Sequence, residues 1–134
     1  MHKSNREICS NLNNEFRAAN IKLNAAKIRQ TDAENTISSG NGNISGYEYE
    51  ITQINVQLGA FEVGGFVGGR AIGIVSAGQI AQLKSRKRKL EDQISSTKRD
   101  IEEAKQILKE VEQIQYIQRD LMRQIENERS NLGC

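Results

Sequence analysis

The chain has 134 residues and a formal net charge of +2, and its composition is unusual for a compact domain. It contains no Pro, no Trp, three Tyr, three Phe and one His, while charged residues make up 27%. A globular domain turns often and fills its centre with aromatic side chains. This composition therefore excludes a thick globular core and favours long helices with narrow apolar stripes. The small net charge does not by itself indicate a nucleic-acid-binding protein.

The first predicted helix begins near Ser4, because a hydroxyl three residues before Glu7 matches a capping box that satisfies free backbone N–H groups. Apolar residues then recur at alternating three- and four-residue steps as far as Ile37. These positions are Cys9, Leu12, Phe16, Ala19, Leu23, Ala26, Gln30, Ala33 and Ile37. We therefore expect one helix of roughly 33 residues.

A turn is predicted at residues 38–46, which contain three Gly, several Ser and Asn, and an Asn-Gly pair. Ser45 and Glu48 repeat the capping pattern, so a second helix is expected to begin there. Folding the two helices together about this turn brings Phe16 opposite Gly68, which matches a bulky side chain with a small one. The sequence thus predicts an antiparallel helical hairpin over residues 1–79.

Residues 59–78 contain seven Gly, and small residues recur there every four positions. That spacing places a smooth strip on one helix face, where another backbone can approach closely. The predicted helix-contact strip consists of Gly65, Gly68, Gly69, Gly73 and Ala77. An alternative is membrane insertion, because residues 63–78 carry a single charge and a basic cluster follows. The short length and the central Arg70 disfavour a stable single span, so the alternative is an oligomeric pore or conduit.

Residues 80–134 are predicted to form a long helix of about 50 residues that stops at Gly133. Its apolar stripe requires cover from another helix, which we expect to be a copy of the chain or a partner protein. The residues expected to form this oligomerisation seam are Leu83, Leu90, Ile94, Ile101, Leu108, Val111, Met122 and Ile125. Polar residues interrupt the stripe at Lys87, Thr97, Gln115, Gln118 and Arg129. Apolar residues also extend it onto a neighbouring face at Ile107, Ile114, Ile117 and Leu121.

Five positive charges within six residues form a basic cluster at Lys84, Arg86, Lys87, Arg88 and Lys89. The cluster is a candidate contact for phosphate or anionic lipid, and the alternative is a solvated helix face. No aromatic residue lies nearby to stack on bases, so base recognition is not expected.

No residues are arranged for catalysis or metal binding. His2 is the only imidazole, and the paired carboxylates, such as Glu102 with Glu103, lack a Glu-x-x-His partner. Cys9 and Cys134 lie near opposite ends of the chain, where we expect neither a disulfide framework nor a metal site and therefore a reducing compartment. The first residues lack the apolar region of a signal peptide. We expect no cofactor, no metal, no small-molecule substrate and no enzymatic activity.

The sequence predicts an all-α protein with a hairpin at 1–79 and a long coiled-coil helix at 80–134. In style it resembles small helical components of secretion or phage particle assemblies, although no motif carries that likeness. The expected function is structural assembly as an oligomeric coiled coil, in the cytoplasm or within a macromolecular particle. Insertion of residues 59–78 into a membrane is the alternative. A nucleic-acid packaging protein that uses residues 84–89 is the weaker alternative.

Overall fold

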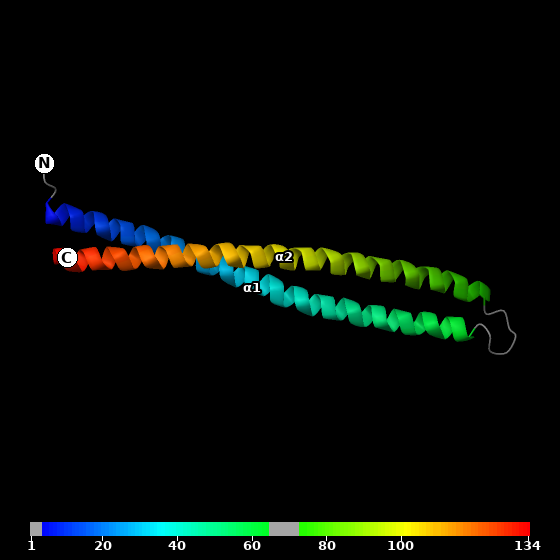
Figure 1. Ribbon diagram of the computed structural model, residues 1–134. Coiled ribbons are helices and arrows are strands. Elements are labelled where there is room, and N and C mark those ends of the chain that lie inside the picture. The colour runs from blue at the N-terminus through cyan, green and yellow to red at the C-terminus, as the bar shows by residue number, and fades with distance from the viewer. Residues whose placement is uncertain (1–3, 65–72) are drawn as a thin grey trace. The chain divides into compact units, whose positions relative to one another are not determined.

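The protein is an all-α helical hairpin of two long helices (Figure 1). The computed structural model describes the backbone of residues 4–64 and 73–134 and the side chains of residues 4–60 and 77–134. Helix α1 spans Asn5–Gly64 and helix α2 spans Gly73–Leu132, each with 60 residues. The chain divides into two compact units, and each unit pairs one part of α1 with one part of α2. The first unit is Met1–Asn35 with Glu103–Cys134, and the second is Thr36–Glu102.

The start of α1 and the end of α2 are both capped as the sequence predicts. The backbone N–H of Glu7 donates to Ser4 Oγ at 3.3 Å, and the N–H of Ile8 donates to the Ser4 carbonyl at 3.1 Å. At the other end, Gly133 has a φ of +71°, a conformation that glycine adopts readily. The N–H groups of Gly133 and Cys134 donate to the carbonyls of Ser130 and Arg129, at 3.2 and 2.9 Å. This pair of bonds is a Schellman motif, which ends α2.

The turn predicted at residues 38–46 is wrong, because these residues lie inside α1. The capping pattern at Ser45 does not mark a helix start for the same reason. Glycine and asparagine cost at most about 1 kcal/mol each inside a helix, and tertiary packing can outweigh that amount. Here the packing that outweighs this cost is the contact of buried Gly40 with α2. The hairpin instead follows the end of α1 at Gly64, and α2 begins at Gly73.

Gly40 lies at a close contact between the two helices in the second unit. A Cβ atom built on Gly40 would lie 2.8 Å from Ile101 Cγ1, 2.9 Å from Ile101 Cδ1 and 3.3 Å from Thr97 Cγ2. Ile101 is itself buried, so its side chain has little room to move away. Ile54 and Leu90 are also buried in this unit, and Ile44, Tyr47 and Ile94 are half-buried.

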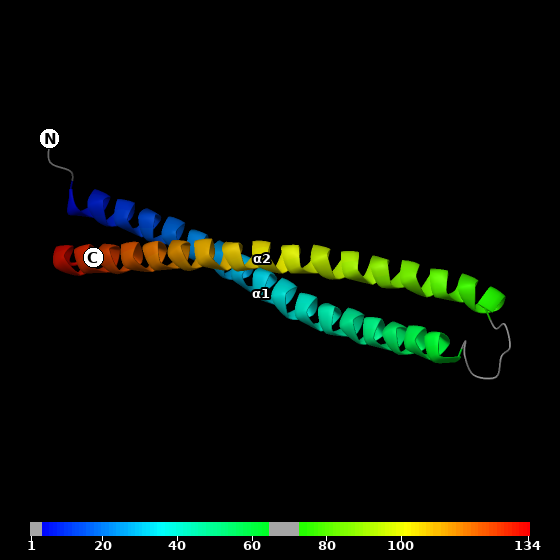
Figure 2. The ribbon, with the colours of Figure 1, turned by 45° about the vertical axis from the view of Figure 1, so that its right-hand side comes forward.

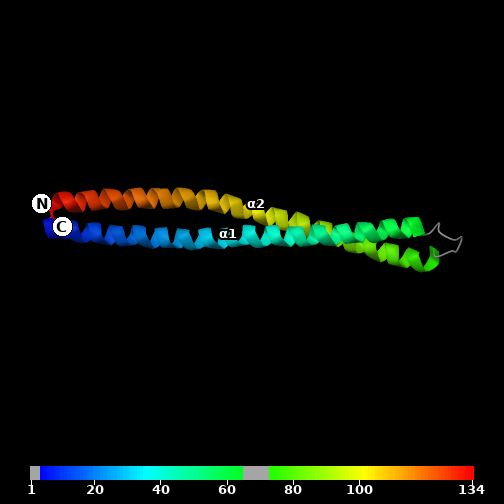
Figure 3. The same cartoon turned by 90° about the horizontal axis from the view of Figure 1, so that it is seen from below.

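In the first unit, the beginning of α1 and the end of α2 run side by side in opposite directions (Figures 2 and 3). The buried residues are mostly alanines and leucines on α1, and α2 adds larger residues such as Val111 and Ile125. The Arg129 guanidinium lies 5.8 Å from the centre of the Phe16 ring, and Gln115 bonds to Gln30. Phe16 and Gln30 are 14 residues apart, as are Gln115 and Arg129, so one register holds between these contacts. Phe16 therefore packs near Arg129, and the predicted pairing of Phe16 with Gly68 is wrong.

We expect alanine to have opposite effects at two glycines of α1. Gly42→Ala should raise the free energy of unfolding by about 0.5–1 kcal/mol, because nothing lies within 4 Å of its Cβ position and alanine favours the helix. Gly40→Ala should lower it by about 1 kcal/mol, since the clash with Ile101 exceeds that gain. Urea denaturation of both variants measures the difference. Stabilisation by both substitutions would contradict the close contact at Gly40.

Candidate functional site

Most of the helix-contact strip predicted in the Gly-rich segment lies outside the described residues. Gly65, Gly68 and Gly69 are among these, and Gly73 is the first residue of α2. The side chain of Ala77 is described and is exposed. Sequence reasoning missed the close contact at Gly40. The sequence signal for it was present, because Gly40 continues the three- and four-residue periodicity from Ile37 to Ile44.

The basic cluster lies within α2 rather than at its first turn, and its side chains do not converge. Lys84, Arg88 and Lys89 are exposed, whereas Lys87 occupies a stripe position and is half-buried. Arg86 Nη2 lies 3.3 Å from Glu50 Oε2, and both side chains are about half exposed or more. Such a pair contributes at most about 1 kcal/mol. The cluster therefore provides a largely solvated positive face, and its contact with phosphate or anionic lipid stays a prediction.

The stripe predicted as an oligomerisation seam is covered by the chain itself. Leu90, Ile101, Val111 and Ile125 are buried, and Leu83, Ile94, Leu108 and Met122 are half-buried. The phase of the predicted stripe is confirmed, because no stripe position from Ile80 to Leu132 is fully exposed. The expectation that another chain must cover it is corrected, since α1 pairs with α2 within each unit. The physical reason is that 60 continuous residues of α1 provide a second stripe of matching length.

Polar residues occupy several stripe positions of the first unit. Gln115 is 8% exposed, and its Nε2 donates to Gln30 Oε1 at 2.6 Å. Gln30 Nε2 in turn donates to Glu34 Oε1 at 3.0 Å. Gln118 Oε1 and Arg129 Nε are buried without a hydrogen-bond partner. Hydrogen bonds between stripe residues select one register at some cost in stability.

The two cysteines are joined in a disulfide, so the expectation that they do not pair is wrong. Their Cα atoms are 5.9 Å apart, although 125 positions separate them in the sequence. The antiparallel register brings the first turns of α1 to the end of α2, and the Schellman motif positions Cys134 beside Cys9. This pairing removes the ground for inferring a reducing compartment from the cysteines.

A second apolar face lies on α2 in the first unit, and we call it the side face. Ile107 and Ile114 are half-buried, Ile117 is 58% exposed and Leu121 is 39% exposed. The neighbouring Tyr116 is also exposed. Since Ile107, Ile114 and Leu121 are seven residues apart, they follow one line along the helix. The side face is defined by Ile107, Ile114, Ile117 and Leu121.

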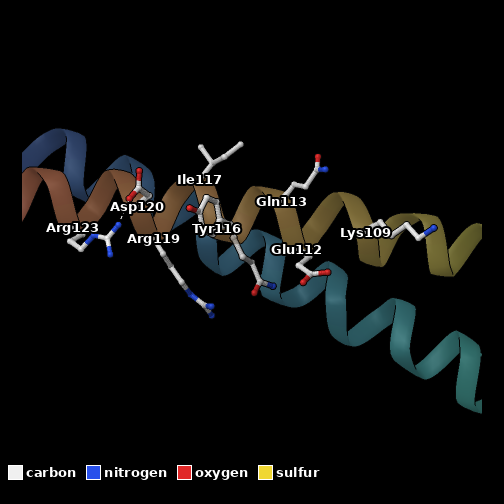
Figure 4. A pocket seen from close by; sticks show the side chains of 9 residues that line it. Lys109, Glu112, Gln113, Tyr116, Ile117, Arg119, Asp120 and Arg123 are labelled. Carbon is white, nitrogen blue, oxygen red and sulfur yellow. Dashed lines mark hydrogen bonds and ion pairs between the residues drawn. The ribbon is translucent and has the colours of Figure 1, made fainter.

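A hollow beside α2 is lined in part by the side face. Its lining does not bring reactive groups together. Its lining comes from residues 109–123 of α2 alone. Figure 4 shows Gln113 and Ile117 projecting to one side of the helix and Glu112 and Arg119 to the other. Asp120 is bonded to Arg123, its neighbour one turn away. These side chains point apart, and this arrangement suits contact with another surface better than enclosure of a small molecule.

The described residues contain no cluster of His, Cys, Asp or Glu suited to hold a metal ion. Among the helices that the structure describes, none is long and apolar enough to cross a membrane. No family model, curated protein or solved structure matches the chain.

Replacement of the two glutamines should show that they act as a pair. Gln115→Leu alone should lower the free energy of unfolding by about 1 kcal/mol, because Gln30 Oε1 loses its donor. Adding Gln30→Leu should at least restore the wild-type value, since two apolar residues replace both partners. A double-mutant cycle by urea denaturation should give a coupling energy of about 1 kcal/mol. Independent, additive effects would rule out the pair as a register contact.

Proposed function

We propose that this protein is a non-enzymatic assembly protein that associates with copies of itself through the side face of α2. The observation that carries this proposal is the exposure of Ile117 and Leu121 next to Ile107 and Ile114. Helical chains leave apolar residues in a regular line on the surface where another helix packs. The intramolecular partner of α2 already covers its main stripe, so this second line is available to another chain.

A second exposed apolar line, on α1, supports a second copy as the occupant. The α1 surface of the first unit presents Ile21 and Ile28, both more than 60% exposed. Residues 17–29 around them contain four Lys or Arg and no Asp or Glu. On α2, Glu103 and Glu110 lie on the same line as Ile107 and Ile114, at three- and four-residue steps. Glu110 pairs with Arg29 of the same chain at 3.8 Å, and Lys109 and Arg119 also belong to this stretch of α2. The support for a second copy is therefore that each chain presents one exposed apolar line on α1 and one on α2, which suits reciprocal packing.

The proposed oligomer forms through the side face and not through the main stripe, so each hairpin stays intact on association. Two hairpins that pack by their outer faces form a bundle of four helices, a common arrangement for long helices with a second apolar line. A structural component of a larger particle would use contacts of this kind.

Ile117→Glu should weaken self-association at least about tenfold, because a carboxylate would be buried at the contact. The measurement is the mass in solution by light scattering as concentration changes, compared with 15.0 kDa for one chain. Ile28→Glu should have a similar effect, because Ile28 belongs to the complementary face.

The matched control is Val56→Glu, which alters an equally exposed apolar residue in the second unit and should leave association unchanged. A wild-type protein that remains at the mass of one chain would contradict self-assembly. Equal loss of association in all three variants would contradict the assigned face.

A further inference from the structure

We propose that the Cys9–Cys134 disulfide is a reducible clamp that controls whether the outer ends of α1 and α2 stay together. A dithiol reductant, either a small molecule or a protein, would open it. The clamp acts inside one chain and does not depend on the proposed self-association.

The helix register alone brings the two cysteines to bonding distance. Their Cα separation of 5.9 Å falls within the usual range for disulfides. Cys9 occupies a stripe position of α1 and is half-buried. Cys134 is exposed, and its backbone N–H is fixed by the bond to the Arg129 carbonyl. Packing therefore holds one sulfur in place, and the other is on the side open to a reductant.

Polar residues interrupt the apolar stripe near the clamp. From residue 115 to residue 132, three of the six stripe positions of α2 are polar, namely Gln115, Gln118 and Arg129. Gln118 Oε1 and Arg129 Nε are buried without partners there. Buried polar atoms without hydrogen bonds oppose packing. These two unsatisfied polar atoms oppose packing near the end of the first unit, where the covalent link adds stability.

The opening step is thiol–disulfide exchange. A thiolate of the reductant attacks Sγ of exposed Cys134, the S–S bond breaks, and Cys9 leaves as a thiolate that takes up a proton. The second thiol of the reductant then attacks the mixed disulfide and releases Cys134 as a thiol. Two electrons pass from the dithiol to the protein, and the reductant leaves as a disulfide. The first turns of α1 can then separate from α2 and expose Leu12, Phe16 and Ile125.

Hydrogen–deuterium exchange of the full chain, with and without a small dithiol, tests the clamp. Reduction should raise amide exchange at residues 8–19 and 122–132 at least about tenfold, because opening from the ends becomes easier. Exchange at residues 44–54 and 90–97 of the second unit should change less than about twofold.

The double variant Cys9→Ser/Cys134→Ser should exchange like the reduced protein and should not respond to the dithiol. Unchanged exchange at the ends on reduction would overturn the proposal. An equal rise in both units would also overturn it, because the disulfide would then stabilise the whole chain and not its ends.

Discussion

The packing of one apolar stripe on α1 against one on α2 inside a single chain is the interaction on which the other features depend. Each helix presents its stripe on one side only, and an uncovered stripe would remain in contact with water. Small residues on α1 allow the two backbones to approach, as where Gly40 meets Ile101. The antiparallel direction of this packing also brings Cys9 to Cys134 and Gln30 to Gln115.

Because the chain covers its own main stripe, the proposed function rests on the surfaces that this packing leaves outside. The side face of α2 and the basic-flanked line of α1 are the two apolar surfaces that the first unit presents. Both are helical faces with exposed apolar side chains, and the proposed contact between chains uses them. The disulfide adds a second level of control, since it determines whether the ends of the stripes themselves remain covered.

Periodicity predicted the all-α class, the stripe positions from Ile80 to Leu132, and the two outer helix ends at Ser4 and Gly133. The turn prediction at residues 38–46 failed although the periodicity continues there, because turn propensity is a local preference and the burial of Gly40 against Ile101 is a long-range contact. Periodicity did not identify the partner of each stripe. A repeat of three and four residues aligns in many registers, so Phe16 matched Gly68 in phase as well as it matches Arg129. The disulfide depends on the true register, so the sequence pattern could not predict it either.

Nuclear magnetic resonance tests the central claim most directly, through a contact between Gly40 and Ile101. In a dilute mixture of isotope-labelled and unlabelled chains, we expect a strong nuclear Overhauser effect from a Gly40 Hα to the Ile101 δ-methyl group within the labelled chains. This result would place the two helices together inside one molecule. Absence of the effect, or its appearance only between labelled and unlabelled chains, would contradict the intramolecular hairpin.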